Sequence, residues 1–335
     1  RLWAVAETPQ GFRLHRSDDA GWSWAFVTDV DDYWRTLEAS AVDPGLCAWG
    51  GVEVHRTANG GASFAVVNTW GEYYGDPAGK LHADVPGLDL VPDGAGGETW
   101  YVATDGGLYR STDGLESVQN LSQDGLRVSQ YYTTLTSPFA PDQVVAGAQD
   151  QGYQRATTPP DGSGLVDFDQ LISGDYGHAV STDGSHDFVF SVYPGFLLVQ
   201  KGAVGPKLYT FDFPAGDHSW MPSLAADPTR KDAVFFCGSK LWRYQKTVGL
   251  NVWVPVQHSA QDFAVDPGEH LTAVAFSPLV AGRAYATTNR GRLWRSADHG
   301  VTWLLSPGLG PGPHYFYGTA LLASATDPDV AWVGG

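Results

Sequence analysis

The feature that most constrains the fold is an internal repeat, in which two short apolar runs are joined by a turn. The first run ends at Asp-Pro, Ser-Pro or a related turn, and the second run ends in glycine. Five clear copies and two weaker ones occupy residues 38–51, 88–104, 133–148, 179–192, 223–238, 273–288 and 321–335. The turn residues fall at positions 43, 91, 137, 183, 227, 277 and 327, which gives a period of 44 to 50 residues. Such periodicity bounds the architecture before any single residue does.

The repeat predicts a β-propeller. Its runs are rich in Val, Ala, Phe, Tyr and Trp and are bounded by Gly, Pro or Asp, as expected of short strands. A period of about 40 to 50 residues with several strands per unit is typical of propeller blades. No stretch keeps a 3.6-residue periodicity, so we expect almost no helix. The expected fold is all-β, with seven blades of four antiparallel strands, lettered a to d from the axis outward.

We expect one propeller domain over residues 1–335, with one blade shared by the two ends of the chain. Residues 2–6 read as a b strand with no a strand before them, and residues 318–325 read as an a strand. Pairing these segments would close the ring and leave no edge unpaired. Residues 329–335 resemble a further b strand, so we also expect the natural chain to continue into more repeats. The blades expected are residues 1–27 with 318–328, 33–70, 88–120, 128–170, 177–213, 221–257 and 271–305.

A second motif, Ser/Thr-x-Asp/Asn-x-Gly-x-Ser/Thr-aromatic, recurs between the expected c and d strands. The acidic or amide side chain can accept backbone N–H bonds within its own turn, the glycine can take positive φ, and the aromatic ring packs beneath. We therefore expect these residues to hold the fold and to take no part in catalysis. The copies comprise Ser17, Asp19, Gly21 and Trp24; Thr57, Asn59, Gly61 and Phe64; Ser296, Asp298, Gly300 and Trp303; and a partial copy with Ser111 and Asp113.

This motif resembles the Asp box of the BNR-repeat propellers. That superfamily includes sialidases, xyloglucanase-type glycoside hydrolases, sortilin-type receptors and photosystem assembly factors. The resemblance covers nearly the whole chain and implies the propeller fold. It implies no particular function, because the box is a structural device and function depends on a site.

The loops predict where a ligand would bind. Antiparallel strands place the a–b and c–d turns at one end of each blade and the b–c and d–a connections at the other. Binding residues gather on loops held by a rigid scaffold, and the second set of loops mixes aromatic rings with carboxylates, which suits sugars or polar peptides. The candidates for ligand binding are Trp34, Trp70, Tyr73, Tyr74, Tyr153, Tyr176, His178, Tyr193, Trp220, His314 and Tyr315.

Charge and cysteine content exclude several classes of function. The chain has 20 basic and 37 acidic residues and a net charge of -17. This argues against binding to nucleic acid or an anionic membrane surface, and no apolar run is long enough for a transmembrane helix. The composition favours a secreted, periplasmic or extracellular protein. Cys47 and Cys237 cannot form a disulfide framework, and we expect both to be unpaired and buried in b strands.

Enzymatic alternatives depend on carboxylates. A sialidase would need three arginines around the substrate, but Arg56, Arg110 and Arg295 each begin an Asp box, which puts them at blade ends and away from the axis. The resemblance to xyloglucanase-type hydrolases nominates Asp105, in the ATDGGLYR stretch, with Asp150 or Asp175 as its partner. We expect no cofactor, although acidic loops could hold calcium. The leading interpretation is an exported module that binds a glycan or protein ligand through the b–c and d–a loops. The alternative is a glycoside hydrolase or an inactive relative of one.

Overall fold

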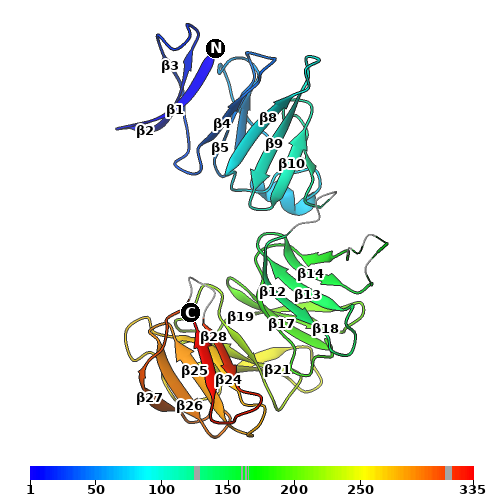
Figure 1. Ribbon diagram of the computed structural model, residues 1–335, viewed down its shortest axis with the longest axis vertical. Coiled ribbons are helices and arrows are strands. Elements are labelled where there is room, and N and C mark those ends of the chain that lie inside the picture. The colour runs from blue at the N-terminus through cyan, green and yellow to red at the C-terminus, as the bar shows by residue number, and fades with distance from the viewer. Residues whose placement is uncertain (124–128, 160, 163, 165, 314–318) are drawn as a thin grey trace. The chain divides into compact units, whose positions relative to one another are not determined.

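The computed structural model describes residues 1–123, 129–159, 161–162, 164, 166–313 and 319–335. It divides into two compact units, residues 1–130 and 131–335, and each is treated by itself below. Strands dominate both units (Figure 1). The expected scarcity of helix is confirmed, since the described residues contain a single 3₁₀ turn, η1, at Trp70–Gly75.

The first unit begins with three strands and continues with two four-stranded sheets. All neighbouring strands are antiparallel and consecutive in sequence. The first sheet contains β1 (Leu2–Thr8), β2 (Gly11–Ser17) and β3 (Ala25–Asp29). The second contains β4 (Thr36–Ala39), β5 (Cys47–Gly50), β6 (Val54–Thr57) and β7 (Ala65–Val66). The third contains β8 (Gly87–Pro92), β9 (Glu98–Thr104), β10 (Gly107–Ser111) and β11 (Gln119–Asn120).

The second unit repeats the four-stranded meander four times and ends in a two-stranded sheet. Its first two sheets are β12 (Tyr131–Thr136), β13 (Val144–Ala148), β14 (Gly152–Ala156) and β15 (Asp169–Ile172), then β16 (Gly177–Val180), β17 (Phe188–Tyr193), β18 (Phe196–Lys201) and β19 (Lys207–Asp212). The next two are β20 (Leu224–Ala226), β21 (Ala233–Cys237), β22 (Leu241–Lys246) and β23 (Trp253–Gln257), then β24 (Leu271–Phe276), β25 (Ala284–Thr288), β26 (Arg292–Ser296) and β27 (Leu304–Leu309). β28 (Ala320–Ala323) pairs with β29 (Ala331–Gly334).

These sheets are the blades of a β-propeller fold, which confirms the predicted all-β architecture. The described residues contain six four-stranded meanders and the three-stranded β1–β3 sheet, besides β28 and β29. The pairing of residues 318–325 with residues 2–6 would join the two units and stays a prediction, as does the single domain. Residue 318 itself lies outside the described residues.

One turn of the repeat lies two residues later than predicted. Val91 does not sit at a turn, because β8 continues to Pro92 and Val91 pairs with Thr99. The a–b turn of this sheet begins at Asp93, whose carboxylate accepts the N–H groups of Ala95 and Gly97 at 2.7 and 2.8 Å. A carboxylate that accepts hydrogen bonds from its own turn is a common way to start one.

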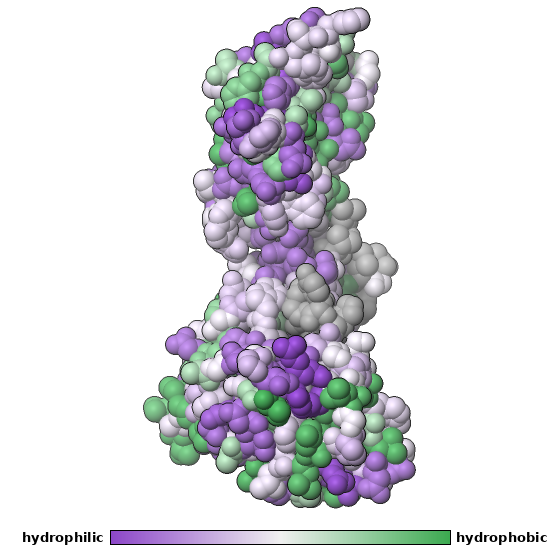
Figure 2. Space-filling model, turned by 90° about the vertical axis from the view of Figure 1, so that its left-hand side faces the viewer, coloured by the Kyte–Doolittle hydropathy of each residue, from purple (hydrophilic) through white to green (hydrophobic). Residues whose placement is uncertain are grey.

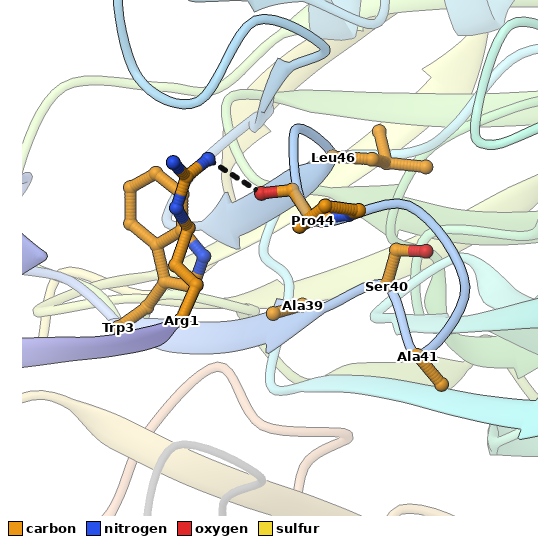
Figure 3. A pocket seen from close by; sticks show the side chains of 7 residues that line it. All are labelled: Arg1, Trp3, Ala39, Ser40, Ala41, Pro44 and Leu46. Carbon is orange, nitrogen blue, oxygen red and sulfur yellow. Dashed lines mark hydrogen bonds between the residues drawn. The ribbon is translucent and has the colours of Figure 1, made fainter. Parts of the chain in front are cut away.

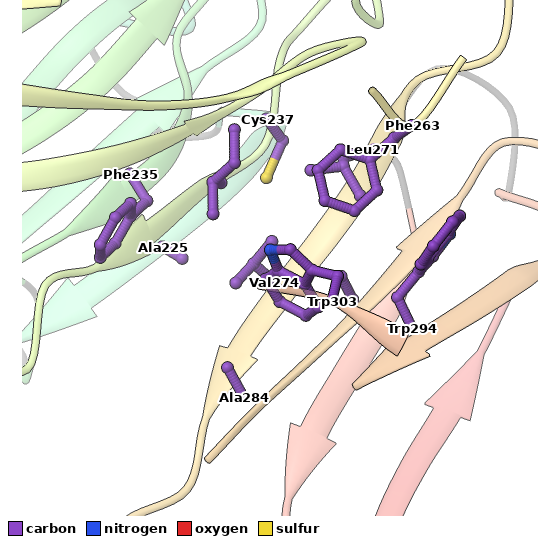
Figure 4. Close-up of a cluster of buried hydrophobic side chains, with 11 residues drawn as sticks. Ala225, Phe235, Cys237, Phe263, Leu271, Val274, Ala284, Trp294 and Trp303 are labelled. Atoms are coloured by element: carbon purple, nitrogen blue, oxygen red, sulfur yellow. The ribbon is translucent and has the colours of Figure 1, made fainter. Parts of the chain in front are cut away.

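The apolar cores lie between neighbouring blades. β21 is buried along its whole length because both faces of this inner strand are covered, and its sequence AVFFC is continuously apolar. Phe235 and Cys237 pack against Leu271 and Val274 of the next blade, with Trp294 and Trp303 completing the cluster (Figure 4). Each such side chain contributes about 1.5–3 kcal/mol when it leaves water.

The predictions for the two cysteines are confirmed. Cys47 lies in β5 and Cys237 in β21, and these are the b strands of their blades. Both thiols are free and fully buried. Burial raises the pKa of each thiol to about 12, so neither is a thiolate at neutral pH.

In the part of the chain that the structure describes, no helix is both long and apolar enough to cross a bilayer. On the face drawn in Figure 2, hydrophobic residues stand among hydrophilic ones. Isolated apolar residues of this kind are normal on a protein surface.

Candidate functional site

The two ends of the blades differ in their loops. At one end the c–d turns meet the a–b turns: the N–H of Gly60 donates to the carbonyl of Gly45 at 2.9 Å. We call this the turn end. At the other end the b–c and d–a loops meet: the N–H of Asp84 donates to the carbonyl of Val52 at 2.9 Å. We call this the loop end, and it is where the sequence places the ligand-binding residues.

At the turn end of the first unit, the structure has a small pocket of about 220 Å³. It lies between β1 and the β4–β5 turn, where the Arg1 guanidinium donates to the carbonyl of Pro44 at 2.7 Å (Figure 3). Its lining is Arg1, Trp3, Ala39, Ser40, Ala41, Pro44 and Leu46. None of the residues singled out from the sequence faces it.

Four of the c–d turns, at residues 17–24, 57–64, 111–118 and 296–303, share one hydrogen-bond pattern, and we call them the Asp-box turns. In the last of them the N–H of Gly300 donates to Ser296 Oγ at 2.9 Å, and Ser296 Oγ donates to Asp298 Oδ1 at 2.8 Å. Asp298 also accepts the N–H and hydroxyl of Thr302 at 2.9 and 2.6 Å. Hydrogen bonds from Thr302 lower the pKa of Asp298 to about 2. The side-chain oxygens of Ser296, Asp298 and Thr302 are thus used inside their own turn.

The other copies keep this pattern with different residues. The pairs Ser17–Asp19, Thr57–Asn59 and Ser111–Asp113 are joined at 2.8, 2.9 and 2.8 Å. Gly21 and Gly61 have φ of +93° and +88°, and Leu115 takes φ +68° where the partial copy lacks glycine. Phe64 is partly buried. The partial copy therefore keeps its turn although a leucine replaces the residue best suited to positive φ.

The aromatic residues of the motif differ in burial. Trp303 is 7% exposed and contacts Phe263 with ring centroids 5.6 Å apart. Trp24 is 44% exposed, so the expectation that it is a buried aromatic residue is wrong. The β1–β3 sheet is the first of its unit and no earlier blade of that unit covers this ring. Both indole N–H groups still donate to the turn, to Gly21 and Gly300 carbonyls at 3.1 and 2.8 Å.

Four acidic residues, Asp31, Glu53, Asp84 and Asp105, lie on linked loops at the loop end of the first unit. The N–H of Asp105 donates to the carbonyl of Asp84 at 3.1 Å. Glu53, in the β5–β6 turn, accepts the N–H of Trp70 at 3.0 Å. A Cβ on Gly51 of that turn would lie 2.9 Å from Asp31 Oδ2, so Asp31 contacts it too. The contacts link two d–a connections with two b–c turns, and Asp105 is among the residues singled out from the sequence.

Aromatic rings accompany these carboxylates. Trp34, Trp70 and Tyr74 are each about half exposed, and Trp70 meets Tyr74 edge to face at 5.8 Å between centroids. Tyr73, also predicted to bind a ligand, is fully buried and packs on His82 at 4.7 Å. Trp70, Tyr73 and Tyr74 all lie in η1. This short helix begins with a capping box, in which the backbone N–H of Thr69 donates to the Glu72 carboxylate at 3.0 Å.

Burial tunes two titratable groups beside this surface. It raises the pKa of Asp84, so this carboxyl keeps its proton to higher pH than an exposed aspartate. It lowers the pKa of His55, although Asp31 and Glu53 act in the opposite direction. His55 stacks on Trp49 with ring centroids 4.0 Å apart. At neutral pH the imidazole of His55 is therefore neutral.

The predicted residues of the second unit are mostly packing residues. Tyr153 and Tyr176 are buried, and Tyr153 Oη donates to Gln200 Oε1 at 2.9 Å. Tyr193 is partly buried and stacks on Phe196 at 4.8 Å. His178 has φ +51°, and burial lowers its pKa to about 4. Trp220 is about half exposed. His314 and Tyr315 lie outside the described residues.

The structure brings together two of the three predicted catalytic carboxylates. The backbone N–H of Asp150 donates to Asp175 Oδ1 at 3.0 Å, and Asp150 has φ +58°. Asp105 lies in the first unit, so its proposed pairing with either residue stays a prediction. Among the described residues, no three His, Cys, Asp or Glu side chains are arranged to hold a metal ion.

Sequence analysis missed four residues that this geometry favours. Glu53 and Asp84 join the acidic group in the first unit, as described above. In the second unit Ser219 Oγ lies 3.1 Å from His270 Nε2. These two residues are 51 positions apart, which is about one repeat, so aligning the d–a connections of successive repeats would have placed them side by side.

Comparisons with known proteins give distant similarities to solved structures and no family. No protein-family model matches the chain, and no curated protein matches it. YCF48 from Cyanidioschyzon merolae aligns over 89% of this chain and 91% of its own, at 13% identity and a TM-score of 0.43. The Cps50 (Swd1) β-propeller domain of Myceliophteria thermophila aligns over 87% of this chain and 93% of its own, at 14% identity and a TM-score of 0.42. A GH74 enzyme of Niastella koreensis aligns over 93% of this chain and 58% of its own, at 11% identity and a TM-score of 0.29. These similarities assign neither a family nor an activity.

Proposed function

We propose that the protein is a binding module that takes a carbohydrate at the loop end of residues 1–130. One observation carries this proposal: three half-exposed rings, Trp34, Trp70 and Tyr74, lie on the same linked loops as four acidic side chains. Flat rings pack on the C–H faces of sugars, and carboxylates accept hydrogen bonds from hydroxyl groups. The net charge of -17 favours a neutral ligand over an acidic one.

Two features support a preformed site. The backbone N–H of Trp70 donates to the Glu53 carboxylate at 3.0 Å, and Lys80 Nζ lies 2.8 Å from the Glu72 carboxylate within the same connection. Loops that are already ordered lose less entropy when a ligand binds. We place the protein in a secreted, periplasmic or extracellular setting on its composition, and we propose that it is an Asp-box propeller on the hydrogen bonds of its c–d turns.

A glycan array and a peptide array, each probed with and without calcium, test this proposal. We expect binding to a class of neutral glycans, and loss of that binding in Trp70→Ala. Binding to peptides and to no glycan would show that the ligand is a protein and not a carbohydrate. Binding that requires calcium would indicate that the acidic loops hold a calcium ion.

Glycoside hydrolysis is the second candidate, and the raised pKa of Asp84 favours it. A hydrolase needs one carboxyl group that is protonated and one that is ionised. Burial raises the pKa of Asp84, which suits the carboxyl group that must donate a proton, and the backbone N–H of Asp105 donates to the Asp84 carbonyl at 3.1 Å. Release of reducing ends from an array-positive glycan, lost in both Asp84→Asn and Asp105→Asn, would support this function. Binding without release would support the binding module.

A further inference from the structure

The loop end of the second unit holds a serine–histidine contact that the proposed function does not use. Ser219 lies between β19 and β20, and His270 directly precedes β24. Ser219 Oγ is 3.1 Å from His270 Nε2, and His270 Nδ1 is 3.0 Å from the carbonyl oxygen of Gly268. Asn289 Nδ2 also lies 3.3 Å from Nδ1, but it donates to the Gly268 carbonyl at the shorter distance of 3.0 Å. A carbonyl can only accept, so we assign the ring proton to Nδ1, which donates to Gly268. Nε2 then accepts the hydroxyl proton of Ser219.

Asn289 holds the histidine in place from the neighbouring b–c turn. The N–H of His270 donates to Asn289 Oδ1 at 3.1 Å, and the N–H of Asn289 donates to the carbonyl of His270 at 3.0 Å. The side-chain amide of Asn289 also donates to the carbonyl of Gly268 at 3.0 Å. The group that orients the imidazole is therefore itself fixed by a side chain.

The serine loop is anchored as firmly. The N–H of Ser239, in the β21–β22 turn, donates to the carbonyl of Asp217 at 2.7 Å. Gly216 has φ +126°, and a Cβ there would lie 2.7 Å from Ser239 Oγ. The same turn accepts the N–H of Leu271 at the Gly238 carbonyl, at 3.0 Å. Serine and histidine are thus held by one shared turn, the kind of support that a reactive pair requires.

The surroundings keep the imidazole neutral. Burial lowers the pKa of His270, and the neighbouring His218 acts in the same direction. Asp217, Glu269 and the Gly268 carbonyl act in the opposite direction without reversing the shift. Ser219 and His270 are only partly buried, so a small molecule can reach them. The half-exposed ring of Trp220 follows Ser219 in the chain and offers an apolar contact.

We propose that Ser219 is a nucleophile and His270 its general base, and that the second unit accepts an acyl group from an ester. Ser219 Oγ forms a bond to the carbonyl carbon while its proton passes to His270 Nε2. The bond between that carbon and the ester oxygen breaks, and the leaving oxygen takes the proton from His270. Water then hydrolyses the acyl-serine: His270 takes a proton from water and returns it to Ser219, which releases the carboxylic acid.

The test uses p-nitrophenyl acetate as the probe with the whole chain. We expect p-nitrophenolate release and one acetyl group on the peptide that contains Ser219, found by mass spectrometry. Ser219→Ala should lose this label, and His270→Gln should slow acetylation by about a hundredfold, the low end for a positioned general base. The rate should rise with pH as His270 loses its proton, with a midpoint below the ordinary histidine pKa.

Ser185→Ala is the matched control, because Ser185 lies in the a–b turn between β16 and β17, at the turn end, where its hydroxyl donates to Asp183 at 2.7 Å. It should acetylate at the wild-type rate, and thermal melts should show that all three variants fold. An acetyl group found only on other residues would overturn the proposal. So would an unchanged rate in folded Ser219→Ala or in folded His270→Gln.

Discussion

The backbone N–H of Trp70 donates to the carboxylate of Glu53 at 3.0 Å, which ties the backbone of one connection to the b–c turn of the preceding blade. The contact joins the residue that carries an exposed ring to an acidic side chain of the site. Because the bond uses the backbone of Trp70, the ring can be removed by mutation without breaking it.

Removal of the Trp70 ring should weaken binding of the array-positive glycan about tenfold, or about 1.4 kcal/mol. The ring is about half exposed, so Trp70→Ala should leave the melting temperature nearly unchanged. Titration calorimetry measures the affinity. Trp22→Ala is the control, because Trp22 is 90% exposed and belongs to a c–d turn at the turn end. Equal affinity in the two variants would contradict a site at the loop end.

The two tryptophans of the c–d turns should differ in their effect on stability. Trp303→Ala removes a buried ring and should lower the free energy of unfolding by about 3–5 kcal/mol. Trp24→Ala should cost much less, because its ring is already 44% exposed. Urea titrations followed by circular dichroism compare them. Similar losses in both variants would mean that another part of the protein covers Trp24.

Acid sensitivity should reside partly in the c–d turns. The folded-state pKa of Asp298 is about 2, below its ordinary value of 3.8. A lowered pKa stabilises the fold above the unfolded value, and this contribution is lost as the pH falls from about 4 towards 2. Asp298→Asn should fold at pH 7, since Asn59 accepts the equivalent N–H of Ser63 at 3.0 Å. Its stability should vary less across that range, as urea titrations at stepped pH would reveal.

Both cysteines should resist thiol reagents in the folded protein. Cys47 and Cys237 are buried, and burial raises the pKa of each to about 12. Ellman's reagent should react slowly in buffer and rapidly with two thiols in guanidinium chloride. A missing thiol after unfolding, or a 47–237 disulfide in non-reducing mass analysis, would oppose this prediction.

Ring closure is open to a deletion experiment. If residues 318–325 complete the blade that begins at residues 2–6, removal of residues 318–335 leaves a strand edge unpaired. The shortened chain should then aggregate or lose its cooperative melt. A melt identical to that of the whole chain would show that the two segments do not pair.

The repeat made the strands predictable, because each short apolar run must be covered on both faces and each turn needs residues that break a strand. The turns at Asp43, Ser137, Asp227 and Ser277 follow directly from this rule. The turn predicted at Val91 was wrong by two residues, because Asp93 and the surrounding glycines allow a turn at more than one position. The sequence alone could not distinguish the two positions.

The site was harder to predict because sequence indicates which end of a blade a residue occupies, but not where its side chain points. Tyr153 and Tyr176 are buried, whereas Trp34 and Trp70 are about half exposed, although all were selected by the same criterion. Trp24 was misjudged for a related reason, since its burial depends on a neighbouring blade. Ser219 and His270 were missed because their contact arises only when two repeats pack side by side.

In the four Asp-box turns, the Ser/Thr hydroxyl and the Asp/Asn side chain bond within their own turn, and these turns lie at the opposite end of their blades from the b–c and d–a loops. Selection can therefore replace the residues of one end without disturbing the bonds at the other. The scaffold can therefore accept loops of new length or chemistry. Such a loop joins two strand ends that are already paired in the sheet, and the side-chain bonds of the Asp-box turn do not depend on it. Grafting foreign loops between β9 and β10, or between β25 and β26, would exploit that independence.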